Sequence, residues 1–287
     1  MKEKFEEYLN KKFKNIKMTP EVKNLKEEII SDLLEKSEEV KEITTDEDKN
    51  YEICINSLGD LYTLIKEYKK DYSKLDKKIE LPKYKLGEEL LNSISHGIGV
   101  LLSITALVLG TIKADSGLAL FGVLIYSISS IVLYLMSCIY HSLKPNNAKR
   151  IFRIIDHCSI YILIAGTYTP IVLLKLPTAL GWWMFGIVWT IAVIGIVLNS
   201  IDIKKFKTIS MALYLIAGWC IIFSFKSLWE NMNHIGILLT LIGGIIYTVG
   251  AILYGIGKRK KYMHSVFHIF CVLASVCFFL SIYMYVL

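Results

Sequence analysis

The sequence predicts an all-α protein, in which a seven-transmembrane helix bundle follows a small soluble helical domain. Its 287 residues are 54% hydrophobic, with a mean hydropathy of +0.46, which is too apolar for an ordinary soluble domain. Apolar runs long enough to cross a bilayer begin near residue 90. Charge divides the chain at the same place, because residues 1–89 hold 22 acidic side chains and residues 90–287 hold four.

The N-terminal segment, residues 1–72, is predicted to be a cytoplasmic helical module. Phe5, Leu9 and Phe13 recur at helical spacing. Pro20 suits the first position of a second helix, and Asp46 suits the cap of a third. A fourth helix is expected around Leu61, Leu64, Ile65 and Tyr68, before a linker at 73–87. The segment carries no catalytic pattern, so we expect a sensing or interaction module with a protein partner.

Residues 88–287 are predicted to form the membrane domain. No cleavable signal peptide is expected, because the first apolar run follows a long charged segment. Seven apolar runs can span a bilayer, at roughly 90–112, 117–141, 152–174, 180–200, 208–226, 233–257 and 263–286.

Basic residues concentrate in alternate gaps between these runs, which predicts the orientation of the bundle. Eleven occupy the second, fourth and sixth gaps: Lys144, Lys149, Arg150, Arg153, Lys204, Lys205, Lys207, Lys258, Arg259, Lys260 and Lys261. The other gaps hold Lys113, Lys175 and Lys226. By the positive-inside rule, the N-terminus is cytoplasmic and the C-terminus lies outside. A basic stripe on a soluble face is absent from the pattern, so no nucleic-acid partner is expected.

Three histidines are predicted to meet at the cytoplasmic ends of the spans and to bind a metal ion. His264 and His268 are four residues apart and therefore share one helix face, and His141 ends another apolar run. Polar side chains are costly in membrane helices and indicate function. Three protein ligands with one open position are typical of catalytic Zn²⁺. The alternative is that these histidines form hydrogen bonds between helices.

Other polar residues are expected near the same leaflet. Asp156 is the candidate that holds a water molecule and moves its proton, and Ser137 lies one turn before the first histidine, where its hydroxyl can donate a hydrogen bond to a carbonyl oxygen. Glu89, Asn92 and His96 form one stripe of the first span, which is either a polar network behind the metal ligands or a solvated helix start. The sequence H-x-x-x-H lacks the glutamate of a zincin protease.

Residues 84–287 resemble the hemolysin III family, the bacterial branch of the progestin-and-adipoQ-receptor superfamily. The resemblance lies in five stretches: GEELLNSISHGIG at 87–99, SCIYHS at 137–142, RIIDHCSIYILIAGTYTP at 153–170, IIYTVGAILYG at 245–255 and HSVFHIFCVLAS at 264–275. The N-terminal segment resembles short helical prefix domains of bacterial membrane proteins, through INSLGDLYTLI.

The family resemblance implies seven transmembrane helices with the N-terminus inside, in a bacterial plasma membrane. It implies zinc bound by His141, His264 and His268, an aspartate at Asp156 that holds the zinc-bound water, and a serine at Ser137. Similarity of the superfamily to alkaline ceramidases suggests hydrolysis of a lipid amide or ester. Bacterial members are associated with haemolysis, and other members with membrane-lipid homeostasis.

The sequence is therefore compatible with three functions. The first is zinc-dependent hydrolysis of a membrane lipid. The second is a non-catalytic sensor of membrane lipids in which zinc is structural. The third is a pore-forming cytolytic protein, which the scarcity of charge along the spans disfavours.

Overall fold

The computed structural model describes residues 1–14, 16, 18, 20–61, 63, 65, 81–82, 84–256 and 260–287. The expected fourth helix around Leu64 and Tyr68, most of the predicted linker, and Lys258 and Arg259 lie outside these residues. The described residues are helices and connecting turns, without a strand. They divide into two compact units, Met1–Glu80 and Leu81–Leu287.

The N-terminal unit is built from α1 (Lys2–Phe13), α2 (Pro20–Lys41) and α3 (Glu47–Ser57). The Asp46 carboxylate caps α3 by accepting hydrogen bonds from two backbone N–H groups of its first turn. The apolar stripes of the helices meet in one core, which is formed by Phe5, Leu9, Phe13, Val22, Leu25, Ile29, Leu33, Val40, Cys54, Leu61 and Ile65. The stripe pattern in the sequence therefore identifies the buried face of each helix.

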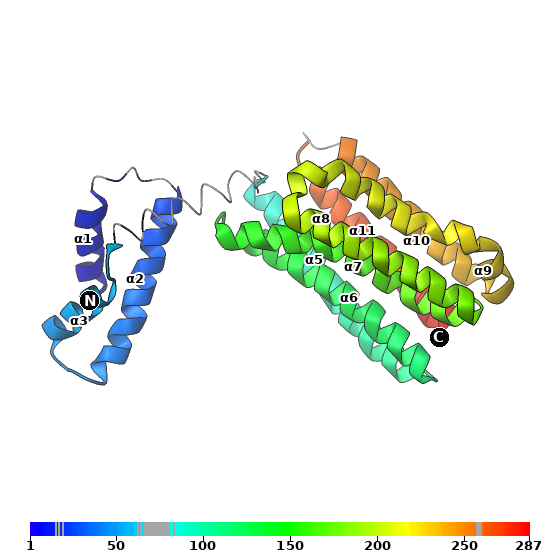
Figure 1. The fold of residues 1–287 in the computed structure, drawn as a ribbon, viewed down its shortest axis with the longest axis horizontal. Coiled ribbons are helices and arrows are strands. Elements are labelled where there is room, and N and C mark those ends of the chain that lie inside the picture. The colour runs from blue at the N-terminus through cyan, green and yellow to red at the C-terminus, as the bar shows by residue number, and fades with distance from the viewer. Residues whose placement is uncertain are drawn as a thin grey trace. The chain divides into compact units, whose positions relative to one another are not determined.

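The second unit begins with three long helices, α5 (Leu86–Lys113), α6 (Gly117–Ser142) and α7 (Asn147–Lys175), which pack against one another in chain order (Figure 1). The chain continues through α8 (Thr178–Trp219), the 3₁₀ turn η1 (Cys220–Ser224) and the short helix α9 (Phe225–Asn231). It ends with α10 (His234–Ile256), α11 (Met263–Ser281) and the π-helical turn η2 (Ile282–Val286).

Six helical segments among the described residues are long and apolar enough to cross a membrane, so the protein is a multi-pass membrane protein. The sequence predicts seven spans, and the difference lies in one segment. The 54 residues Thr178–Asn231 count as one of the six segments, and they contain both the predicted fourth and fifth spans.

Helix α8 is interrupted at Asp202, whose φ of −165° and ψ of 100° are not helical. Its carboxylate accepts hydrogen bonds from the backbone N–H groups of Lys204 and Lys205, both at 2.9 Å, and so starts the helix again. Across the break, the Ser210 hydroxyl donates to Asn199 Oδ1 at 2.6 Å. Eleven residues of straight helix would separate these side chains by about 16 Å. Helix α8 therefore turns back on itself at Asp202.

Pro170 lies inside α7 and does not end the helix, which continues to Lys175. The pyrrolidine ring packs closely on α6, where a Cβ on Gly122 would lie 3.0 Å from Pro170 Cα. A proline costs a helix one backbone hydrogen bond, and packing by neighbouring helices can offset that cost within a membrane bundle.

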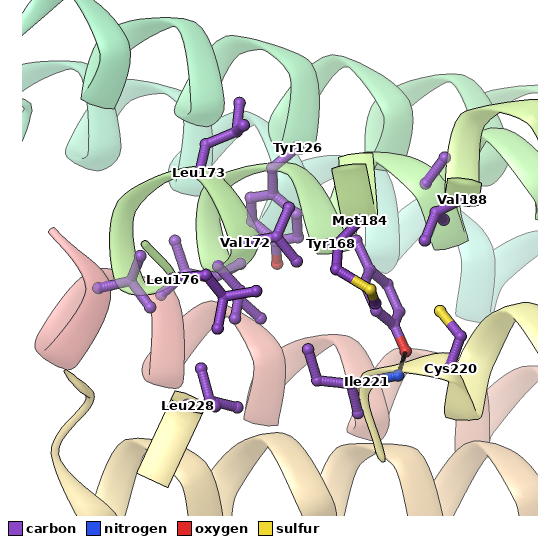
Figure 2. Packing of buried hydrophobic residues seen from close by; sticks show 14 of the residues in the cluster. Tyr126, Tyr168, Val172, Leu173, Leu176, Met184, Val188, Cys220, Ile221 and Leu228 are labelled. Carbon is purple, nitrogen blue, oxygen red and sulfur yellow. Dashed lines mark hydrogen bonds between the residues drawn. The ribbon is translucent and has the colours of Figure 1, made fainter. Parts of the chain in front are cut away.

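The largest buried apolar cluster among the described residues is built mainly from α7 and α8, with further residues from η1 and η2 (Figure 2). Tyr168 organises it, because its hydroxyl donates to the Gly218 carbonyl at 2.8 Å and accepts the Ile221 N–H at 3.1 Å. These two bonds satisfy backbone groups where α8 gives way to η1. The Tyr168 hydroxyl thus supplies hydrogen bonds to backbone groups that would lack a partner where the α-helix changes to a 3₁₀ turn.

Candidate metal centre

The three predicted histidines meet in the structure. His141 lies in the last turn of α6, and His264 and His268 lie in the first turns of α11. His264 Nε2 is 3.3 Å from His141 Nε2 and 3.1 Å from His268 Nε2. One nitrogen from each ring lies within 4.8 Å of the others, and this group can hold a metal ion.

These separations fit a zinc ion. Two imidazole ligands of tetrahedral zinc, with Zn–N bonds of about 2.0–2.1 Å, have their nitrogens about 3.3–3.4 Å apart. A shared hydrogen can satisfy one such pair of nitrogens but not three that converge on one point. Three imidazole nitrogens also suit zinc better than calcium or magnesium, which prefer oxygen ligands.

The far nitrogens of two rings face acceptors, which fixes where their protons lie. His141 Nδ1 is 2.6 Å from Glu89 Oε2, and His268 Nδ1 is 3.4 Å from the Asn92 carbonyl oxygen. A neutral imidazole that donates from Nδ1 has a lone pair on Nε2, which is the form that binds a metal ion. The buried Nε2 lone pairs of these rings therefore point toward the same space, an arrangement that a cation stabilises.

The Glu89 carboxylate has a second partner, Lys149, which the sequence analysis treated only as a topology signal. Lys149 Nζ donates to Glu89 Oε1 at 2.7 Å and to the Leu143 carbonyl at 2.8 Å. The position of Lys149 in the sequence could have indicated that its ammonium group has an acidic partner. Asn146 caps α7, which places Lys149 in the first turn, where the helix dipole disfavours a cation.

The two predicted catalytic side chains also lie at this end of the bundle. Asp156 is buried in α7, and its carboxyl interacts electrostatically with His141 and Ser137. The Ser137 hydroxyl is fully buried and faces the Asp156 carboxyl, with no other hydrogen-bond partner among the described residues. A water molecule or substrate oxygen would satisfy such a hydroxyl. The structure therefore places an acid and a hydroxyl donor beside the histidine cluster.

His96 joins the cluster as a stacked ring. Its ring lies 3.7 Å from that of His268, with an interplanar angle of 16°, and meets the edge of Tyr134 at 5.1 Å. Neither of its buried nitrogens has a hydrogen-bond partner within the described part of the chain. All three members of the predicted polar stripe on α5 therefore contact the histidines, and His96 does so by packing.

The remaining two histidines contribute no nitrogen to this group. His157 Nδ1 lies 3.7 Å from Asp156 Oδ2, and its ring is partly exposed. His234 starts α10 and stacks on Trp229 at 3.9 Å.

Two tyrosine rings lie next to His264, and neither was predicted from the sequence. The Tyr84 ring lies parallel to the imidazole at 5.1 Å, and Tyr254 lies 5.2 Å away. Burial raises the pKa of the Tyr84 phenol well above its ordinary value, so the group stays neutral. Nearby, Glu88 Oε1 accepts the backbone N–H of Tyr262 at 2.7 Å and so joins the start of α11 to α5.

Comparison with known proteins gives the family of this chain. Residues 84–279 match the family described as "Haemolysin-III related". The chain belongs to the haemolysin-III-related family. It is 39% identical over 203 residues to "Hemolysin-3" of Bacillus cereus, a match that covers 70% of this chain and 92% of that protein.

Two further relatives extend this result. The "Hemolysin-3 homolog" of Bacillus subtilis is 40% identical over 205 residues, which are 70% of this chain and 96% of the homolog. The "Monocyte to macrophage differentiation factor" of Homo sapiens is 25% identical over 167 residues, 56% of this chain and 68% of that protein. The haemolysin-III-related region contains every residue of the candidate metal centre and excludes the first 83 residues.

Proposed function

We propose that this haemolysin-III-related protein is a zinc-dependent hydrolase of a lipid amide or ester. The observation that carries the proposal is the convergence of three Nε2 atoms, two of them on rings whose Nδ1 atoms face acceptors. Bound zinc would polarise a substrate carbonyl and lower the pKa of a water ligand to about 7.

The protein's own residues would supply the rest of the chemistry. His141, His264 and His268 would hold the ion and leave one position open. Asp156, which is buried in α7 and interacts electrostatically with His141, would accept the proton of the attacking water and return it to the leaving group. The buried Ser137 hydroxyl would donate a hydrogen bond to the carbonyl oxygen as this oxygen gains charge.

The proposal includes seven crossings of a bacterial plasma membrane. A continuous helix of 54 residues would be about 80 Å long, whereas the hydrocarbon core is about 30 Å thick. The reversal at Asp202 would let this segment cross twice. Seven crossings, with the basic gaps inside, would put the histidine cluster at the inner leaflet and the N-terminal unit in the cytoplasm.

A second candidate function is a lipid sensor in which zinc is structural. The position of Tyr84 favours it, because this ring covers one face of His264 and the residue directly precedes α5. Tyr84 lies four residues after Glu80, the last residue of the N-terminal unit. A protein partner of the N-terminal unit is part of this second proposal.

The decisive experiment measures hydrolysis by purified protein in liposomes that contain a panel of lipid amides and esters. We expect turnover by the wild type and a loss of about 10²–10⁴-fold in Asp156→Asn, because general acid–base catalysis contributes that much. Zinc content should be unchanged in the variant. Asp115→Asn makes the same substitution on an exposed turn beyond the opposite end of α6 and should retain full activity.

Two results would contradict the hydrolase. A zinc-loaded wild type that hydrolyses no lipid of the panel would favour the sensor. Equal turnover by Asp156→Asn and the wild type would remove the aspartate from the mechanism.

A further inference from the structure

We propose that Glu89 and Lys149 form a positioning pair, which holds His141 in the tautomer whose Nε2 can bind metal. This inference rests on the proposed function, because it assumes a metal ion at the three histidines. It adds a specific role for two charged side chains of the first and third long helices. Neither residue would touch the ion, and both would act through His141.

The pair links three helices in one chain of contacts. Lys149 Nζ of α7 is 2.7 Å from Glu89 Oε1 of α5, and Glu89 Oε2 is 2.6 Å from His141 Nδ1 of α6. Each carboxylate oxygen thus has its own partner, so the plane of the carboxylate is fixed from both sides. A fixed acceptor orients the imidazole ring as well as its proton.

The burial of the lysine indicates a specific role. Only 2% of the Lys149 surface is exposed, and its ammonium also donates to the Leu143 carbonyl and lies 5.2 Å from the centre of the Tyr140 ring. Burying the ammonium group carries a large desolvation cost even beside the Glu89 carboxylate, whose side chain is 18% exposed, and buried ion pairs often stabilise a fold no better than apolar residues would. Stability alone therefore does not account for this pair, whereas orientation of a metal ligand does.

Asn92 makes the tautomer depend on Glu89. Asn92 Nδ2 is 3.3 Å from the same His141 Nδ1 atom, and an amide nitrogen is a donor. If the carboxylate is removed, this amide favours an unprotonated Nδ1 and a proton on Nε2. That proton would occupy the place where the ion binds. Loss of Glu89 should therefore weaken metal binding even when all three histidines remain.

The test compares zinc affinities of the full chain in detergent, by competition with a chromophoric chelator. Glu89→Gln and Lys149→Met should each bind zinc about 10–100-fold more weakly, the range typical for partners behind a metal ligand. The loss of zinc affinity in the double variant should be smaller than the product of the two single-variant losses, because both residues act through one contact. Cobalt absorption spectra should change in the same variants, which a general loss of stability would not produce.

Ser93→Ala is the matched control. Ser93 lies in the same part of α5, and its hydroxyl pairs with Ser142 of α6 at 2.7 Å without touching a histidine. We expect zinc affinity within twofold of the wild type and an unchanged cobalt spectrum.

The possible outcomes separate this inference from the proposed function. Wild-type affinity and spectrum in Glu89→Gln would overturn the positioning pair and leave the metal site intact. A wild type that binds no zinc would overturn both. If the single variants do not fold, the double variant removes both charges together, and undiminished affinity in it would overturn the pair.

Discussion

Replacement of His264 by alanine is expected to remove the bound metal entirely. His264 Nε2 is the atom that contacts both other ligand nitrogens, at 3.3 Å and 3.1 Å. Without it, two imidazoles from different helices remain, and a zinc site with two protein ligands lacks the three that zinc sites normally use. Metal content should fall from about one zinc per chain to less than about a tenth of that.

Plasma mass spectrometry on purified protein measures this directly. His157→Ala provides the control, because it removes an imidazole beside Asp156 that is not part of the ligand group. The control should keep its zinc. If His264→Ala retained a full complement of zinc, the three histidines would be packing groups, and the hydrolase and the positioning pair would both fail.

The second large effect is expected on stability, from Gly181→Ala at the start of α8. A Cβ at this position would lie 2.4 Å from the carbonyl oxygen of Val172, a backbone atom of the packed helix α7. A backbone atom cannot move aside as a side chain can, so the two helices must separate. Overpacking of this kind typically costs about 1–3 kcal/mol.

Thermal unfolding in detergent tests this prediction. For a unit of this size, each kcal/mol should lower the Tm by roughly 2–4 °C. Gly186→Ala is the matched control, because it lies on the same helix and its Cβ would meet no atom within 4 Å. It should leave the Tm unchanged or raise it, since alanine favours helix. Equal Tm values for the two variants would show that α7 and α8 are not closely packed there.

Much of the fold follows from the sequence, because membrane helices must be long and apolar. The predicted run at 117–141 matches α6 (Gly117–Ser142) almost to the residue. The structure differs from the sequence prediction between the predicted fourth and fifth spans, where hydropathy does not determine the backbone conformation. Residues 201–207 read as a loop between two spans, but helical geometry resumes directly after one residue, Asp202, whose side chain caps the next turn.

In the candidate site, too, some features follow from the sequence and others do not. The i, i+4 spacing of His264 and His268 predicts a shared helix face, and periodicity places Glu89, Asn92 and His96 on one stripe. Nothing in the sequence pairs Lys149 with Glu89, since this contact depends on how α5 and α7 approach each other. The stacking of Tyr84 on His264 also depends on the path of the chain before α5. Local sequence patterns predict which residues share a helix face, whereas contacts between distant segments depend on how the helices pack.

The parallel ring of Tyr84 has a consequence for the kinetics of metal exchange. The rings of His141 and His268 are almost fully buried, and Tyr84 covers a face of His264. An ion held among these rings would be shielded on the side that Tyr84 covers. Its residence time would then depend on the movement of this side chain as well as on the strength of the Zn–N bonds. A site of modest affinity can retain its ion for a long time when departure requires a packed aromatic ring to move first.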